Sequence, residues 1–171
     1  MQIAVHDFIP QFVRSLTALK AVLAKGRSWA DAHKVEFTTL TQTRLVPDQF
    51  ALGRQVQIAT DNAKGCAARL AGVEPPKMED KEQTFEEFMV RIDRTVEFLK
   101  TIKPEQLSGY ESRKVSFPYY PGKYLDGRDY LVQYALPNFY FHVATAYSIL
   151  RASGVDVGKA DYMGDVNWKD G

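Results

Sequence analysis

Several features that mark common functional classes are scarce in this sequence. Its 171 residues contain a single cysteine, Cys66, which excludes an intrachain disulfide and points weakly to the cytoplasm. The 22 Lys and Arg residues almost balance the 21 Asp and Glu residues, so the basic excess of many nucleic-acid-binding proteins is missing. No apolar run approaches the roughly 20 residues of a membrane span, and the N-terminus lacks the pattern of a signal peptide. We therefore expect a cytoplasmic protein that binds neither nucleic acid nor membranes.

The composition that remains is that of an ordinary globular domain. Hydrophobic residues make up 45% and charged residues 25% of the chain. A length of 171 residues fits one domain with a sizeable core. We predict a single domain over residues 1–164 and a loose C-terminal tail at 165–171, and we expect weak packing from about residue 155 onward.

Apolar residues recur every three or four positions in four long segments, as expected for helices that each bury one face. These segments span residues 5–24, 49–71, 85–102 and 127–152. The first two are joined by a long irregular connector at 27–48. Apolar and polar residues alternate in part of 113–125, which predicts a short β-hairpin or an extended flap before the last helix. Amphipathic helices with little strand predict an all-α four-helix bundle.

Capping residues support several of these boundaries. Thr84 and Glu87 have the spacing of a capping box at the start of the third helix. Gly26 and Gly72 are natural stops for the first and second helices. Asp126 can cap the last helix.

The best candidate for a functional site lies in the last predicted helix. Asn138 and His142 stand four residues apart, so they share one helix face and could bind a metal or a polar ligand. Pro137 precedes them, and because proline lacks an N–H we expect it to kink the helix and free the carbonyl of Gln133. The kink either aims the polar pair inward or simply curves the helix around the bundle. A buried polar pair needs partners, since an unpaired group costs about 1–3 kcal/mol.

Other side chains could join this pair. Gln57 and Asp61, on the second predicted helix, stand one turn apart and could face it, although a solvated polar face is the alternative interpretation. Tyr134 falls on the same face as Asn138 and His142, in a region dense in aromatic residues. Tyrosines suit a pocket wall or an interface, and plain packing is the simpler role for most of them. No pair of nucleophile and base can be identified, so catalytic residues stay unassigned.

A family resemblance is spread over most of the chain. The matching stretches are Arg44–Phe50, Ala68–Gly72, Phe117–Lys123, Gly127–Tyr130 and Ala135–His142. In these residues the sequence resembles the DinB/YfiT-like superfamily of bacterial four-helix bundles, and within it a bacterial family of unknown function. The resemblance implies a DinB-like bundle. Many members of that superfamily bind a divalent metal through three histidines, and some use it in thiol-dependent transferase or isomerase chemistry.

The metal ligands of the superfamily are only partly matched. One of its histidines lies on the second helix and two lie at His-x-x-x-His spacing on the last. Carried over to this chain, the three places are held by Gln57, Asn138 and His142. Amide oxygens are poor ligands for zinc or nickel beside imidazole or thiolate. We favour a metal-free cluster in which the two amides and the imidazole bond to one another, and a divalent metal with Asp61 as an added ligand is the alternative.

Three functions stay open at this point. The first is a small-molecule-binding protein with a degenerate metal site, covered by a flap at 117–125. Its predicted ligand-binding residues are Gln57, Asp61, Tyr134, Asn138 and His142. The second is a divalent-metal-dependent enzyme of the thiol-transferase or isomerase type, with His142 as a ligand. The third is a structural or stress-associated interaction protein, for which a homodimer is expected.

Overall fold

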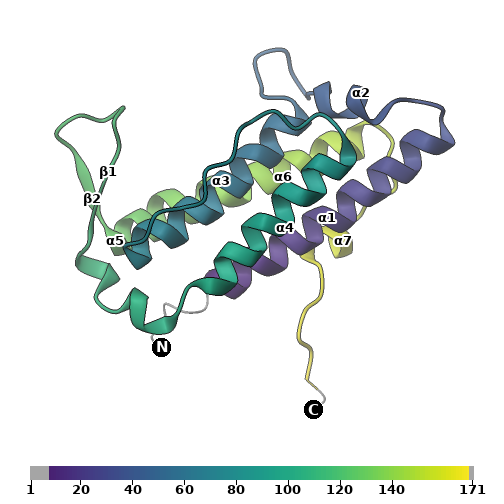
Figure 1. The fold of residues 1–171 in the computed structure, drawn as a ribbon. Helices are drawn as coiled ribbons and strands as arrows, with labels where there is room; N and C mark the ends of the chain where they lie inside the picture. The colour runs from purple at the N-terminus through teal and green to yellow at the C-terminus, as the bar shows by residue number, and fades with distance from the viewer. Residues whose placement is uncertain (1–7, 170–171) are drawn as a thin grey trace.

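Four long helices lie side by side and form one bundle in the computed structural model, which describes residues 8–169 (Figure 1). They are α1 (Phe8–Ala32), α3 (Leu52–Ala71), α4 (Phe85–Thr101) and α6 (Leu136–Ala152). Both α3 and α1 contact α4 and α6, so the helices enclose one core. The predicted all-α four-helix bundle is confirmed.

The core consists mainly of large apolar side chains from all four helices. Phe12, Phe88 and Phe139 are fully buried, and the rings of Phe12 and Phe139 meet edge to face with centroids 4.6 Å apart. Burying such a ring contributes about 1.5–3 kcal/mol. None of the helices in residues 8–169 is both long and apolar enough to cross a membrane.

The connection between α3 and α4 crosses the length of the bundle. The two helices run in the same direction, so residues 72–84 return along the outside (Figure 1). Gly72 ends α3 with a φ of 69°, a left-handed conformation that favours glycine. Thr84 and Glu87 form the predicted capping box, because each side chain accepts a hydrogen bond from the backbone N–H of the other. The predictions for both helix ends are confirmed.

The first helix is longer than predicted. Gly26 does not end α1, which continues to Ala32, and the predicted start at residue 5 lies outside the described residues. A Cβ atom at Gly26 would lie 2.9 Å from the Cδ2 atom of Leu150. The glycine therefore allows α1 and α6 to pack closely and is not a helix stop. The remaining connector contains one short helix, α2 (Phe37–Gln42).

A small hairpin precedes the last helix, as predicted. Strands β1 (Lys114–Ser116) and β2 (Tyr124–Asp126) pair antiparallel with Val115 opposite Leu125. The hairpin extends from one end of the bundle (Figure 1). The segments between α4 and the hairpin are short 3-10 turns at Pro104–Leu107 and Tyr110–Ser112.

The last helix contains an irregular turn immediately before Pro137. It begins as α5 (Gly127–Asp129), widens into a π-helical turn at Tyr130–Ala135, and continues as α6. Asp126 occupies the N-cap position, although its side chain makes no capping hydrogen bond within the described chain. The N–H of Leu136 donates to the carbonyl of Leu131, five residues back. The irregularity expected at Pro137 thus takes the form of a widened turn, which shifts the helix face that follows it.

Part of the C-terminal region packs more tightly than predicted. Val155 and Val157 are buried, and α7 (Lys159–Met163) lies against α1. The Nζ atom of Lys25 and a carboxylate oxygen of Asp161 are 2.7 Å apart. The expectation of weak packing was wrong here, because two alternating valines are too short a pattern to stand out in the sequence.

The chain beyond α7 leaves the bundle (Figure 1). Trp168 is 85% exposed, and residues 170–171 lie outside the described part of the chain. The division into a domain at 1–164 and a loose tail at 165–171 stays a prediction.

Candidate functional site

The side chain that meets His142 comes from Gln55. His142 on α6 is 7% exposed and Gln55 on α3 is 0% exposed. The Nδ1 atom of His142 lies 2.6 Å from the Oε1 atom of Gln55. The two helices run antiparallel, since Arg69 near the end of α3 bonds to Tyr130 before α6. This arrangement places the first turns of α3 beside the middle of α6.

The amide of Gln55 fixes where the proton of His142 lies. Its Nε2 atom donates to the backbone carbonyl of Phe50 at 2.8 Å, so its Oε1 atom is the one that faces His142. An amide oxygen can only accept a hydrogen bond, so the Nδ1 atom of His142 carries the proton. In a neutral imidazole the other nitrogen, Nε2, then holds a free lone pair.

The surroundings of His142 keep the ring neutral. Burial, and secondarily the positive charge of Arg54, lower the pKa of His142 from its usual 6.5 to about 4. In residues 8–169 the only fully enclosed side-chain nitrogen or oxygen without a partner is Oε1 of Gln49. The Nε2 atom of His142, which has no hydrogen-bond partner among these residues, therefore keeps contact with solvent. It is an oriented acceptor in a mostly buried ring.

Gln57 lies on the other side of α3. Its Oε1 atom accepts from Arg54 at 3.3 Å, and its Nε2 atom donates to Glu82 at 3.0 Å. Residues two apart in a helix point about 200° apart, so Gln55 and Gln57 cannot both face α6. The expected meeting of Gln57 with His142 is therefore corrected. The sequence did contain a sign that Gln55 faces the core. Its spacing places it on the same helix face as the apolar residues Leu52 and Ala59.

Asp61 also lies away from His142, in a cluster centred on Arg91. This Arg91 cluster consists of Arg54, Asp61, Lys64, Asp80, Glu82 and Arg91. The side chain of Arg91 is 1% exposed, and its nitrogens lie 2.7 Å from Asp61, 3.0 Å from Asp80 and 2.9 Å from Glu82. The burial of Arg91 was not predicted from the sequence, because a single arginine on an amphipathic helix is normally expected on the solvent-exposed face. The cluster fastens the 72–84 connector to α3 and α4.

Asn138 and Tyr134 precede His142 along the last helix, and both are half-buried. No hydrogen bond of the Asn138 side chain is found within residues 8–169. The hydroxyl of Tyr134 lies 3.0 Å from that of Tyr119 in the hairpin, and its ring centroid is 5.0 Å from that of Phe117. Partial desolvation of the hydroxyl and this contact with Tyr134 raise the pKa of Tyr119 to about 12. The flap thus reaches Tyr134, two turns from His142.

The single cysteine is inert in this setting. Cys66 is fully buried, and burial raises the pKa of its thiol far above the usual range. The guanidinium of Arg69 stacks over the ring of Phe117 at 5.2 Å and does not offset that burial. The interpretation of Cys66 as a packing residue fits this environment.

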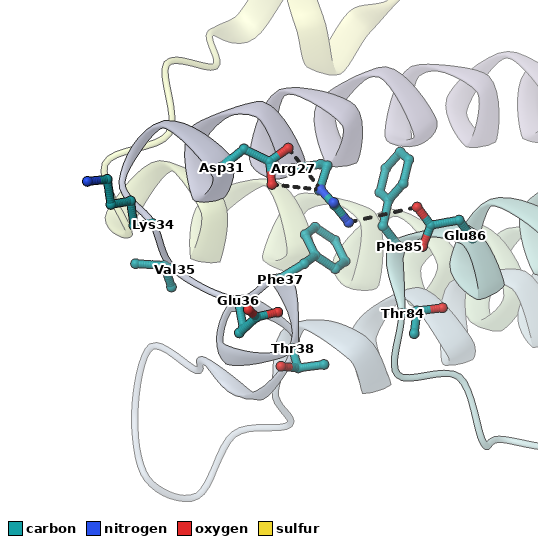
Figure 2. Close-up of a pocket in the computed structure, with 10 residues that line it drawn as sticks. All are labelled: Arg27, Asp31, Lys34, Val35, Glu36, Phe37, Thr38, Thr84, Phe85 and Glu86. Carbon is teal, nitrogen blue, oxygen red and sulfur yellow. Dashed lines mark hydrogen bonds and ion pairs between the residues drawn. The ribbon is translucent and has the colours of Figure 1, made fainter.

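Two surface recesses have volumes of about 410 and 490 Å³, and none of the predicted site residues lines either of them. Figure 2 shows the smaller one, where Arg27 reaches from Asp31 toward Glu86. The nitrogens of Arg27 lie 3.0 Å from Asp31 and 3.8 Å from Glu86. Its positive charge is therefore already matched within the recess. The larger recess borders the Arg91 cluster, whose charges are also paired.

The donor set of this chain does not fit the three-histidine metal centre of the superfamily. Only His142 supplies an imidazole at the three carried-over places, and Gln57 points away from it. Within the described residues, no group of three or more His, Cys, Asp or Glu side chains is placed to hold a metal ion. Amides beside one imidazole would make a weak site.

Comparisons with known proteins agree with this architecture. Residues 6–163 match the model of a family described as a domain of unknown function, DUF1993. The chain is 40% identical to a DinB family member protein from Shewanella denitrificans, whose crystal structure superposes on it with a TM-score of 0.92. The match covers 95% of this chain and 93% of the Shewanella chain. A search of curated proteins finds no match. The chain therefore belongs to the DUF1993 family and has the fold of the DinB-like bundles.

Proposed function

We propose that this protein binds a small molecule where α3 and α6 meet, with the Nε2 atom of His142 as the central hydrogen-bond acceptor. The observation that carries the proposal is the hydrogen bond from His142 to Gln55. It leaves a mostly buried, neutral imidazole with one unpaired nitrogen in a fixed direction. Because that nitrogen keeps contact with solvent, a ligand with a donor group can reach it and replace water as its partner.

The neighbouring side chains suit a ligand with both polar and aromatic character. Asn138, one turn before His142, offers an amide donor and acceptor on the same helix face. Phe141 is 55% exposed although it adjoins a buried histidine. Tyr134, two turns from His142, contacts Tyr119 of the hairpin. Aromatic surface around a few oriented polar groups is typical of small-molecule sites.

A divalent-metal-dependent enzyme of the thiol-transferase or isomerase type is the second candidate. One observation favours it, because an unprotonated imidazole nitrogen oriented by its other N–H is also how histidine binds metals. Metal content of the purified protein, measured by mass spectrometry, separates the two candidates. We expect no stoichiometric metal in the wild type. Near-stoichiometric metal that is lost in His142→Leu would replace the binding proposal with the metalloenzyme.

The third candidate, an interaction protein that forms a homodimer, is favoured by the exposed tyrosines of the hairpin. They are Tyr119, Tyr120 and Tyr124. Sedimentation of the purified protein tests it. A stable dimer that dissociates when Tyr120 is changed to Ser would support it, and a monomer would rule it out.

Phenol is a suitable probe of the binding proposal, since it combines an aromatic ring with a hydroxyl donor. We expect calorimetric titration to show binding to the wild type and a loss of about five-fold or more in His142→Leu, the effect of one hydrogen bond. The matched control is His33→Leu, because His33 is exposed and stacks on Trp29. Equal binding by all three proteins would contradict the proposal.

A further inference from the structure

The side chain of Gln55 is completely buried and both of its polar ends are used. Its Nε2 atom donates to the carbonyl of Phe50, and its Oε1 atom faces the Nδ1 atom of His142. Reversing the amide would set its oxygen against the carbonyl oxygen of Phe50, which is unfavourable because neither atom can donate a hydrogen bond. The backbone at Phe50 therefore determines the orientation of the amide, and the amide determines the position of the proton on His142.

We propose that Gln55 is a positioning residue that holds His142 in the tautomer protonated at Nδ1, so that the site selects ligands presenting a hydrogen-bond donor to Nε2. Neutral hydroxyl or amine groups meet this requirement. Ethers and carbonyls lack a hydrogen-bond donor. The negative charge of a carboxylate would be repelled by the lone pair on the Nε2 atom of His142. The ligand class rests on the proposed function, whereas the tautomer does not.

Gln57 provides a matched control on the same helix. It has the same side chain two residues away, and it is also hydrogen-bonded, but its partners are Arg54 and Glu82 on the opposite face. Changing either glutamine to leucine removes the same groups. A loss of helix stability or a general loosening of α3 would affect both variants, whereas a change of tautomer is expected in only one.

The tautomer can be measured without any ligand. In protein labelled with nitrogen-15 in its three histidines, ring spectra at neutral pH distinguish protonated from unprotonated nitrogens, and His142→Leu identifies the signals of His142. We expect the wild type and Gln57→Leu to carry the proton on Nδ1. In Gln55→Leu this preference should be lost. If the wild type is protonated at Nε2, or if both variants keep the wild-type pattern, the proposal is overturned.

A milder variant covers the case in which Gln55→Leu does not fold. Gln55→Asn keeps the amide but shortens it by one methylene, so it cannot reach both Phe50 and His142. We expect a mixture of the two tautomers in a folded chain, as judged by circular dichroism. A pure Nδ1-protonated ring in this variant would overturn the role of Gln55.

The ligand class is tested by comparing phenol with anisole, its methyl ether, which has the same ring and no donor. The wild type and Gln57→Leu should bind phenol about five-fold more tightly than anisole. The difference should shrink in Gln55→Leu. If the tautomer is as stated but neither compound binds, the proposed function fails and the role of Gln55 stands. If phenol binds and the tautomer differs, the role of Gln55 fails and the proposed function stands.

Discussion

The two faces of α3 carry polar clusters of opposite kinds. The face toward α4 holds the Arg91 cluster, in which every charge meets an opposite charge. The face toward α6 holds Gln55 and His142, which are neutral and leave one ring nitrogen without a partner in the described chain. A polar cluster that satisfies itself has no capacity left for a ligand. We therefore propose a structural role for the Arg91 face and a binding role for the His142 face.

Changing Arg91 to Met should have the largest effect on stability. It removes the buried cation that joins Asp61, Asp80 and Glu82. Asp61 and Asp80 keep Lys64 and Arg54, but the mostly buried carboxylate of Glu82 is left without a cation, and breaking such a pair costs about 3 kcal/mol. Urea denaturation would measure this loss in the free energy of unfolding. The control is Arg94→Met, at an exposed position on the same helix, with a change below about 0.5 kcal/mol. Equal losses in both variants, or a loss of phenol binding by the folded Arg91 variant, would break the division between the two faces.

Acid should weaken the fold through His142. Its pKa is about 4 in the folded chain and 6.5 when unperturbed, so the unfolded state takes up the proton first as pH falls. The contribution is complete above pH 6.5 and is lost as pH falls toward 4, by up to about 3 kcal/mol. Urea denaturation of wild type and His142→Leu across this range would isolate it. The variant should show a smaller loss, and parallel curves would contradict the assignment of a depressed pKa.

The two glutamines of α3 should differ in stability. Gln55→Leu strands the N–H of His142 and the carbonyl of Phe50, at a cost of about 2 kcal/mol. Gln57→Leu should cost about 1 kcal/mol or less, because its partners Arg54 and Glu82 keep other contacts and reach solvent. Thermal unfolding compares them. A larger loss for Gln57→Leu would reverse the ranking of the two faces.

The smallest effect is expected for Asp80→Asn. Hydrogen bonds and charge interactions with Arg54 and Arg91 outweigh partial burial and hold the pKa of Asp80 below its usual range. Its side chain is about one third exposed, however, so solvent screens the interaction, and the loss should stay below about 1 kcal/mol at neutral pH. Denaturation in low and high salt measures it. A loss as large as that of Arg91→Met would show that the cluster does not depend chiefly on its buried arginine.

The sequence predicted the fold well where a pattern repeats over many residues. The helices that became α3, α4 and α6, the Thr84–Glu87 capping box and the hairpin all follow from local periodicity and end signals. The predicted end of the first helix at Gly26 was wrong, because glycine is favoured both at helix ends and where two helices pack closely. The alternating pair Val155 and Val157 was too short to detect.

The candidate site was predicted only in part. His142 was singled out correctly as a buried polar residue of the last helix, but its partner was taken to be Gln57. Which of Gln55 and Gln57 faces His142 depends on how α3 is rotated about its axis relative to α6. The family pattern did not determine this rotation, because it is set by the packing of the two helices. Arg91 was missed for the same reason, because its three carboxylate partners lie outside its own helix, on α3 and the 72–84 connector, and meet it only on folding.

Chemical-shift mapping with phenol, on uniformly labelled protein, tests the central claim most directly. We predict that the backbone amides that shift on binding lie around His142, Asn138 and the first turns of α3, and that these shifts disappear in His142→Leu. Shifts centred on the recess at Arg27, or on the Arg91 cluster, would contradict the account. So would shifts around His142 that persist unchanged in the variant.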